Sequence, residues 1–303
     1  MACYYPLEGW RSAEKNKNGK RPIVFDYSKA MKDMPVKVPC GQCVGCRLER
    51  SRQWAVRCVH EASLHSENCF LTLTYDDDHI PSDGSLCMKH FQDFMKRLRF
   101  NSGIKMRYFH CGEYGDTTQR PHYHACIFGY SPSDKKLWRR SRDNPLFISE
   151  FLEKTWGHGY VVIGNVTFES AAYVARYIMK KITGDMAQEY YSDIDPQTGE
   201  VLNTRLPEYT TMSRRPGIGI GWLEKYSSDV YPHDRVVLRG SKFKPPAAYD
   251  RWLEMTDPSL FTQLKNLRKM SARKKESDNT PDRLRVKEQV KLAQISSLKR
   301  GLL

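Results

Sequence analysis

The sequence predicts an α+β fold in which helices cover an antiparallel sheet. Segments rich in β-branched and aromatic residues alternate with amphipathic segments of helical period. Two of the strand-like segments, residues 104–115 and 122–130, are joined by the polar turn GDTTQRP, as in an antiparallel hairpin. The chain has 303 residues, 40% of them hydrophobic, and is therefore long enough to bury a sizeable core.

The elements are assigned in chain order from their residue patterns. Six Pro and Gly residues interrupt the first forty positions, which are expected to be irregular. Apolar residues at helical spacing predict a helix from Val44 to about His65. The core is then completed by a strand at 69–76, a helix at 88–100, the two hairpin strands, a helix at 147–156, a strand at 160–166 and a helix at 170–182.

The regular pattern weakens after about residue 185. Residues 265–303 carry twelve Lys or Arg against four Asp or Glu, a net charge of +8, and are expected to form a solvated helix or a partly disordered tail. The predicted organisation is a cysteine-rich N-terminal segment at 1–48 packed on the core, the core domain at 49–185, an elaboration of the core at 186–264 and a basic tail at 265–303.

The charge of the chain narrows the classes of partner. A net charge of +14 and a pI near 9.3 favour a polyanion, either nucleic acid or an anionic membrane. No apolar run is long enough to span a bilayer, and the N-terminus MACYYPLEGWRS lacks the apolar core of a signal peptide. We therefore expect a cytoplasmic protein that binds nucleic acid. The absence of a G-x-x-x-x-G-K-[ST] loop argues against a nucleotide-driven motor.

Two histidines and a glutamate form the first candidate site. His122 and His124 are two residues apart on a predicted strand, so they project from the same face, and Glu113 lies near the end of the preceding strand. A carboxylate beside two imidazoles forms a mixed N/O site suited to Mg²⁺ or Mn²⁺ holding a phosphate oxygen. His110 and Asp116 are competing ligands. The alternative is two hydrogen-bonded histidines beside a solvated glutamate.

A predicted helix carries the second candidate site. Tyr173 and Tyr177 are four residues apart and share a face, with Lys181 one turn further along. Tyrosine is a poor nucleophile at its ordinary pKa of about 10, but a metal-bound phosphate is more electrophilic and a lysine stabilises developing negative charge. Two core aromatic residues at helical spacing are the alternative.

The cysteines form a third cluster. Cys40, Cys43 and Cys46 follow C-x-x-C-x-x-C spacing, and Cys3 would complete a tetrahedral structural zinc site. An iron–sulfur cluster or unmetallated thiols are alternatives that the spacing leaves open. The other five cysteines lie among apolar neighbours and are expected to be packing residues: Cys58, Cys69, Cys87, Cys111 and Cys126.

Together these motifs resemble the HUH endonucleases that initiate rolling-circle replication, whose core is RRM-like. The FLTLTY strand is similar to the first motif of that superfamily. With PCGQCVGCR and SRRPGIG, the chain resembles most closely the replication initiators of microviruses, the small single-stranded DNA phages, especially the gokushovirus branch. The resemblance spans roughly Cys40 to Tyr226.

The resemblance implies a role for each matched residue. It implies metal ligation by Glu113, His122 and His124, paired nucleophiles at Tyr173 and Tyr177, and a basic companion at Lys181 or Lys180. In that family one tyrosine attacks a phosphodiester of the origin strand, keeps the 5′ end as a phosphotyrosine and leaves a 3′-hydroxyl to prime synthesis. The second tyrosine acts when the copied unit is cut and closed into a circle.

The expected function is therefore metal-dependent, site-specific nicking and joining of single-stranded DNA at a phage replication origin, with host helicase and polymerase as partners. Arg214, Arg215 and the basic tail are expected to hold the phosphate backbone. An HUH relaxase or transposase is the alternative within the same chemistry. A non-catalytic, zinc-containing nucleic-acid-binding protein is the alternative from another class.

Overall fold

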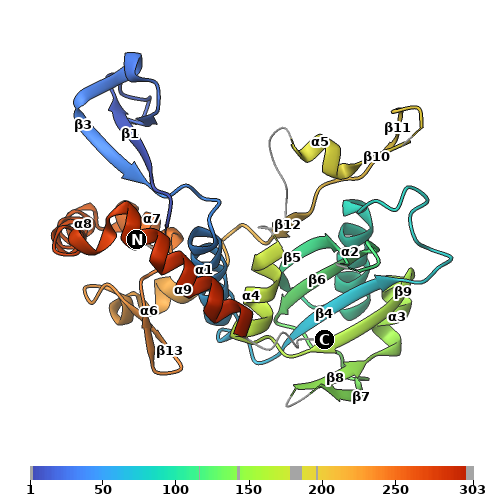
Figure 1. The fold of residues 1–303 in the computed structure, drawn as a ribbon. Coiled ribbons are helices and arrows are strands. Elements are labelled where there is room, and N and C mark those ends of the chain that lie inside the picture. The colour runs from blue at the N-terminus through green and yellow to red at the C-terminus, as the bar shows by residue number, and fades with distance from the viewer. Residues whose placement is uncertain (1–2, 116, 142–143, 178–185, 196, 298–303) are drawn as a thin grey trace. The chain divides into compact units, whose positions relative to one another are not determined.

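The structure is a computed structural model that describes residues 3–297 except 116, 142–143, 178–185 and 196 (Figure 1). The described residues divide into two compact units. The larger unit comprises residues 51–262, and the smaller unit comprises residues 3–50 together with 263–297. Each unit is described by itself below.

A seven-stranded antiparallel sheet forms the centre of the larger unit, in the order β12-β5-β6-β4-β9-β8-β7. This confirms the predicted antiparallel sheet. Its strands are β4 (Asn68–Tyr75), β5 (Arg107–Tyr114), β6 (Pro121–Phe128), β7 (Lys136–Ser141), β8 (Asn144–Ile148), β9 (Gly159–Gly164) and β12 (Tyr209–Met212).

Helices cover both faces of this sheet, because alternate side chains of its central strands are apolar on each side. On one face, Leu71 and Leu73 of β4 pack in a cluster with residues of α2 (Met88–Ser102) and α3 (Glu150–Trp156). On the other face, Phe70 packs with residues of α1 (Val44–Ala62) and α4 (Phe168–Tyr177). The candidate site residues lie on this second face.

The helix predicted at 147–156 begins three residues later, because its first residues belong to strand β8. Ser149 marks the change. Its backbone is extended, and its hydroxyl accepts a hydrogen bond from the Leu152 N–H at 3.1 Å. Asp134 accepts hydrogen bonds from the Ser149 hydroxyl and from the Phe151 N–H, which holds the start of the helix in place.

The Gly-rich segment before α6 is attached to α1. Glu61 accepts a hydrogen bond from the Gly219 N–H at 2.7 Å, and Arg57 donates to the Ile218 carbonyl at 2.9 Å. Gly219 has a φ of +76°, and a Cβ there would lie 2.8 Å from the Tyr249 hydroxyl and 2.9 Å from the Arg57 carbonyl oxygen. Glycine is therefore required at this position.

The rest of the larger unit consists of short elements: α5 (Met186–Tyr191), β10 (Ser192–Ile194), β11 (Val201–Thr204), α6 (Ile220–Val230), β13 (Val236–Leu238), β14 (Ser241–Phe243) and α7 (Ala247–Thr256). Within the described ranges, no helix combines the length and the apolar character needed to cross a membrane.

The prediction that the first forty residues are irregular was wrong. They form a three-stranded sheet of order β2-β1-β3, with bounds β1 (Leu7–Ser12), β2 (Ile23–Val24) and β3 (Ala30–Val38) and the short helix η1 (Tyr27–Lys29). Pro35 is compatible with this sheet because β3 is an edge strand, where an N–H can be missing. Gly19, with a φ of +71°, lies in the connection between β1 and β2.

The basic C-terminal segment is helical where it is described. It consists of α8 (Pro258–Arg273), the short helix η2 (Ser277–Asn279) and α9 (Pro281–Ser297). Within the smaller unit, Leu264 and Leu284 are buried, and the Tyr5 hydroxyl donates a hydrogen bond to Glu288.

Candidate active site

Three candidate metal ligands lie together on the face of the sheet that α4 covers. His122 and His124 belong to β6, and Glu113 belongs to the neighbouring strand β5. Glu113 is paired directly with His122 in the register of the two strands. Because side chains alternate along a strand, all three project to the same side.

The ligand atoms of the three residues converge. Nε2 of His122 and Nε2 of His124 each lie 2.7 Å from Oε1 of Glu113, and one ligand atom from each residue lies within 4.8 Å of the others. Glu113 and His124 are buried, whereas the side chain of His122 is 18% exposed. The site is therefore open to solvent on the His122 side.

The hydrogen bonds around His122 fit a bound cation. Its Nδ1 lies 3.1 Å from the Arg120 carbonyl oxygen, which only accepts, so Nδ1 carries a proton. A neutral His122 then directs the lone pair of Nε2 at the Glu113 oxygen, which is also an acceptor. Two acceptors 2.7 Å apart require a positive charge between them, either a proton or a metal ion. The buried Oε2 of Glu113 accepts no hydrogen bond from the described residues and would also be satisfied by a cation.

The protonation state of Glu113 suits metal binding. Burial acts to raise the pKa of its carboxyl group, but the hydrogen bonds with His122 and His124 and the charge of these residues outweigh burial. The resulting pKa is below the ordinary value of 4.5, so the carboxylate is ionised at neutral pH. The ionised form is the one that coordinates Mg²⁺ or Mn²⁺.

Thr72 of β4 holds the third ligand from behind. Its hydroxyl lies 3.0 Å from Nδ1 of His124, and the two residues are paired in the register of β4 and β6. Such a contact orients the imidazole so that Nε2 faces the ligand centre. Sequence reasoning picked out the FLTLTY strand but assigned no role to Thr72. The alternation of threonine and leucine in that strand was the available signal.

The two competing ligands have different outcomes. His110 lies on the opposite face of the sheet, where its ring stacks on Phe91 with centroids 3.4 Å apart and its Nδ1 lies 3.0 Å from the Thr211 hydroxyl. Burial lowers the pKa of His110 well below its ordinary value. His110 is therefore not part of the ligand group. Asp116 lies outside the described residues.

The predicted tyrosine helix lies against the ligand group. The Tyr173 ring is 5.0 Å from the His124 ring, and the planes of the two rings are nearly perpendicular. The Ser51 hydroxyl fixes α4 on α1 by donating to the Ala172 carbonyl at 2.8 Å. Arg176, which the sequence analysis did not single out, lies with its guanidinium 5.6 Å from the centre of the Tyr173 ring.

The other two residues of that motif are not described to the same extent. Tyr177 is the last residue of α4, and its side chain lies outside the described part of the structure. Lys181, with its alternative Lys180, lies outside the described residues altogether.

A cavity of about 370 Å³ borders the ligand group and Tyr173. Its lining residues include Phe70, Thr72, Val162, Asn165, Tyr173 and Arg239. Arg239 is paired with Glu169 through both guanidinium nitrogens, at 2.5 and 3.2 Å. The cavity thus combines an apolar wall with polar groups, which suits a nucleotide beside the ligand group.

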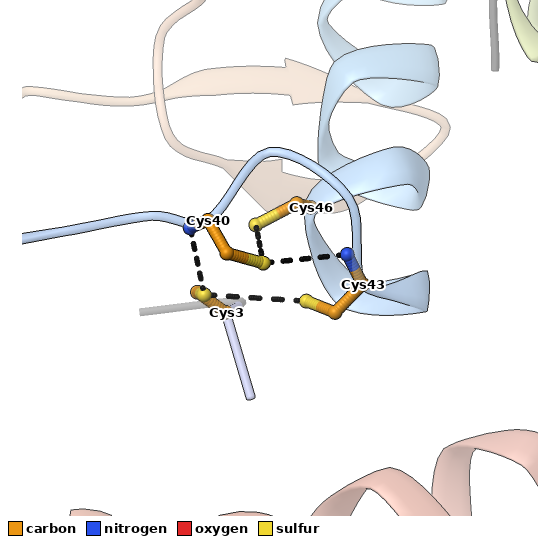
Figure 2. A group of neighbouring side chains, drawn as sticks. All are labelled: Cys3, Cys40, Cys43 and Cys46. Atoms are coloured by element: carbon orange, nitrogen blue, oxygen red, sulfur yellow. Dashed lines mark hydrogen bonds between the residues drawn. The ribbon is translucent and has the colours of Figure 1, made fainter. Parts of the chain in front are cut away.

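The four candidate zinc ligands also lie together, in the smaller unit (Figure 2). One sulfur from each of Cys3, Cys40, Cys43 and Cys46 lies within 4.8 Å of the others, and all four are free thiols. The five remaining cysteines are outside this group; four are buried, and Cys87 is half-buried.

The two candidate DNA-binding arginines are exposed. Arg214 and Arg215 lie in the turn between β12 and α6. The same turn is held to the sheet by Arg107, which donates to the Pro216 carbonyl at 2.6 Å.

Comparison with known proteins gives consistent matches. A family model for replication-associated proteins of the ORF2 type matches residues 68–182, a range that contains the Glu113, His122 and His124 group and both candidate tyrosines. The Replication-associated protein VP4 of Bdellovibrio phage phiMH2K is 34% identical over 298 residues, covering 92% of this chain and 88% of the relative. The Replication-associated protein ORF2 of Spiroplasma virus 4 is 31% identical, covering 84% of this chain and 81% of the relative.

A third relative, the Replication-associated protein ORF4 of Chlamydia phage 1, is 30% identical and covers 79% of this chain and 59% of its own length. No solved structure matches the chain.

Proposed function

The chain belongs to the family of phage replication-associated proteins, the microvirus-like rolling-circle replication initiators, and we propose that it acts by cutting and rejoining single-stranded DNA through a tyrosine of α4. Family membership supports a role in replication initiation. The nicking chemistry is the further step proposed here. The observation that carries it is the contact between the Tyr173 ring and the Glu113, His122 and His124 group.

Glu113, His122 and His124 would hold a Mg²⁺ or Mn²⁺ ion, which when bound would polarise a phosphate oxygen and offset developing negative charge. The protein's own contacts prepare these ligands. Thr72 orients His124, and the Arg120 carbonyl orients His122. Little reorganisation is then needed when the scissile phosphate arrives.

In the proposed reaction the phenol oxygen of Tyr173 or Tyr177 attacks the phosphorus of the scissile phosphodiester. A bond forms from phosphorus to the tyrosine oxygen, and the bond from phosphorus to the 3′ oxygen breaks. The phenol loses a proton, and the departing 3′ oxygen gains one. One phosphodiester is exchanged for another, so no nucleotide hydrolysis is required to drive the step.

Basic groups would assist at two places. Lys181, or Lys180, is proposed to stabilise the charge on the phosphate beside the tyrosines, and Arg176 is a further cation next to Tyr173. Arg214 and Arg215 are exposed and would hold the backbone of the bound strand. The released 3′-hydroxyl would be extended by host polymerase while a host helicase unwinds the duplex.

The test is covalent capture of DNA by the protein. The full chain is mixed with Mn²⁺ and 3′-end-labelled single-stranded fragments that tile the replicon, then separated on a denaturing protein gel. We expect label to migrate with the protein, because the 5′ phosphate of the labelled fragment becomes bonded to tyrosine. EDTA and the double variant Tyr173→Phe, Tyr177→Phe should abolish the band.

Tyr190→Phe is the matched control, because Tyr190 is an exposed tyrosine of α5 outside the candidate site. It should form the adduct at the wild-type level. The double variant should still bind the fragments. If the wild-type protein is folded and binds DNA but forms no adduct with any fragment, the nicking proposal fails and a non-catalytic DNA-binding role replaces it.

A further inference from the structure

The cysteine group in the smaller unit has the geometry of a metal centre. Two Sγ–Sγ distances, from Cys40 to Cys46 and from Cys43 to Cys3, are both 4.0 Å (Figure 2). Tetrahedral zinc with Zn–S bonds of about 2.3 Å separates its sulfur atoms by roughly 3.8 Å. A disulfide would instead require a sulfur–sulfur distance of about 2.05 Å. The four sulfurs are therefore spaced for a shared ion rather than for two disulfide bonds.

Backbone N–H groups point at three of these sulfurs. The Cys40 N–H donates to Cys3 Sγ at 3.2 Å, the Cys43 N–H donates to Cys40 Sγ at 3.3 Å, and the Tyr4 N–H donates to Cys43 Sγ at 3.4 Å. Donors directed at sulfur favour the thiolate, which is the form that binds metal. A cluster of thiolates at this separation needs a cation to offset its charge.

The four cysteines lie where two parts of the unit meet. Leu7 of β1 pairs with Val38 of β3 at one end of the small sheet. Cys3 lies four residues before this pair and Cys40 two residues after it, so both cysteines emerge from the same end. Cys46 lies in the first turn of α1. An ion at this point would join the open end of the sheet to the start of the helix.

The small sheet lacks an apolar core of its own. No residue of β2 or β3 is buried, and the two buried residues of β1 are Gly9 and Ser12. The large apolar side chains of Leu7, Ile23 and Met34 are exposed. A short sheet without a buried apolar face is marginal in water, and small units of this kind are commonly held by a metal or by disulfides.

We propose that Cys3, Cys40, Cys43 and Cys46 bind one structural Zn²⁺ ion that holds the β1–β2–β3 sheet to the N-terminal end of α1. Four thiolates at the corners of a tetrahedron form a closed structural zinc site with no open position for a substrate. A multinuclear iron–sulfur cluster places several iron and sulfide atoms between its cysteines, and sulfur atoms 4.0 Å apart leave no room for them. This proposal is independent of the nicking chemistry, because its ligands and its test do not involve the Glu113, His122 and His124 group.

The first experiment measures metal content by mass spectrometry of the full chain purified without added metal. The measurement uses the variant His122→Ala, His124→Ala, so that the other metal site contributes nothing. We expect about one zinc per chain. Cys3→Ser with Cys43→Ser should lose it. Cys87→Ser is the matched control, because Cys87 is half-buried and lies outside the cluster, and it should keep the zinc.

The second experiment remains informative if the double cysteine variant folds poorly. Zinc is removed from the intact chain with a chelator, and hydrogen exchange of its backbone amides is followed by mass spectrometry. We expect peptides covering β1 and β3 to lose protection, whereas those covering β4 to β6 keep it. Reloading with Co²⁺ should restore protection and produce the visible absorption of a tetrahedral cobalt–thiolate site.

Two results would overturn the proposal. In the first, the purified chain holds less than about 0.1 zinc per chain and all four thiols react at once with a thiol reagent in the folded protein. In the second, iron rather than zinc is present at one or more atoms per chain and is lost in the Cys3→Ser, Cys43→Ser variant. Zinc that Cys87→Ser removes as well would also count against the assigned ligands.

Discussion

At the scale of single residues, the candidate metal centre depends on contacts behind the ligands as much as on the ligands. Each imidazole has one nitrogen held by a neighbour and the other directed at Glu113. The holding groups differ: a backbone carbonyl for His122 and the Thr72 hydroxyl for His124. The carbonyl cannot be mutated, but the hydroxyl can be removed with almost no change of side-chain shape.

The substitution Thr72→Val tests this positioning role. Loss of the hydroxyl frees the His124 ring to rotate, so we expect the affinity for Mn²⁺ to fall by about 10–100-fold. Titration calorimetry with Mn²⁺ measures the change. Thr74→Val is the matched control on the same strand and face, since the Thr74 hydroxyl bonds to the Tyr160 carbonyl and not to a ligand. Equal losses in the two variants would show that Thr72 acts on the strand and not on His124.

At the scale of elements, the structure depends on segments far apart in sequence being held together. The Gly-rich segment carrying Arg214 and Arg215 leads into α6, and Glu61 and Arg57 of α1 hold its end at Gly219. The close approach of Gly219 to Arg57 and Tyr249 leaves no space for a side chain. The attachment of this segment is therefore sensitive to a single methyl group.

Gly219→Ala should lower the free energy of unfolding by roughly 2–4 kcal/mol, because it adds a clash to the strain of a left-handed backbone. Chemical denaturation of the full chain measures this change. Gly240→Ala is the control, because Gly240 has a similar φ of +74° but nothing within 4 Å of its added Cβ. It should cost about 1–2 kcal/mol from strain alone. If both variants lose the same stability, the close approach at Gly219 is unimportant.

At the scale of the whole molecule, charge is the property that extends over both units. The net charge is +14, and the segment from Lys265 onward contributes +8 of it. The lysines of α8 and of the turn after it are exposed. Binding of single-stranded DNA should therefore include a large contribution from counterion release.

The affinity for single-stranded DNA should fall linearly with salt on a double logarithmic plot, and fewer lysines should reduce the slope. Each phosphate contact contributes about 0.7 to the slope, so the triple variant Lys269→Gln, Lys274→Gln, Lys275→Gln should reduce it by about 2. Fluorescence anisotropy across a salt series measures both slopes. Lys89→Gln with Lys96→Gln is the control, because both lysines already pair with Asp93. Binding that is insensitive to salt would contradict a DNA-binding role for this charge.

Much of the larger unit could be predicted from local sequence patterns. The period of apolar residues indicated α1, β4, α2, β5, β6, β9 and α4 close to their observed positions. The small N-terminal sheet was missed for a physical reason. Its strands have few buried residues, so they carry no apolar alternation, and their pairing joins residues far apart in sequence. Strand β12 was missed likewise, because it pairs with β5 across about a hundred residues.

The sequence by itself determined that His122 and His124 share a face, because the two-residue period of a strand requires it. The spacing of Cys40, Cys43 and Cys46 likewise indicated a metal-binding group. Only the tertiary structure decided that Glu113 joins the histidines and His110 does not. Both residues precede the same turn, and their opposite orientations depend on the register of β5 against β6. The contact of Tyr173 with His124 also arises only when α4 packs on the sheet, since packing is set by apolar burial between distant segments and not by local spacing.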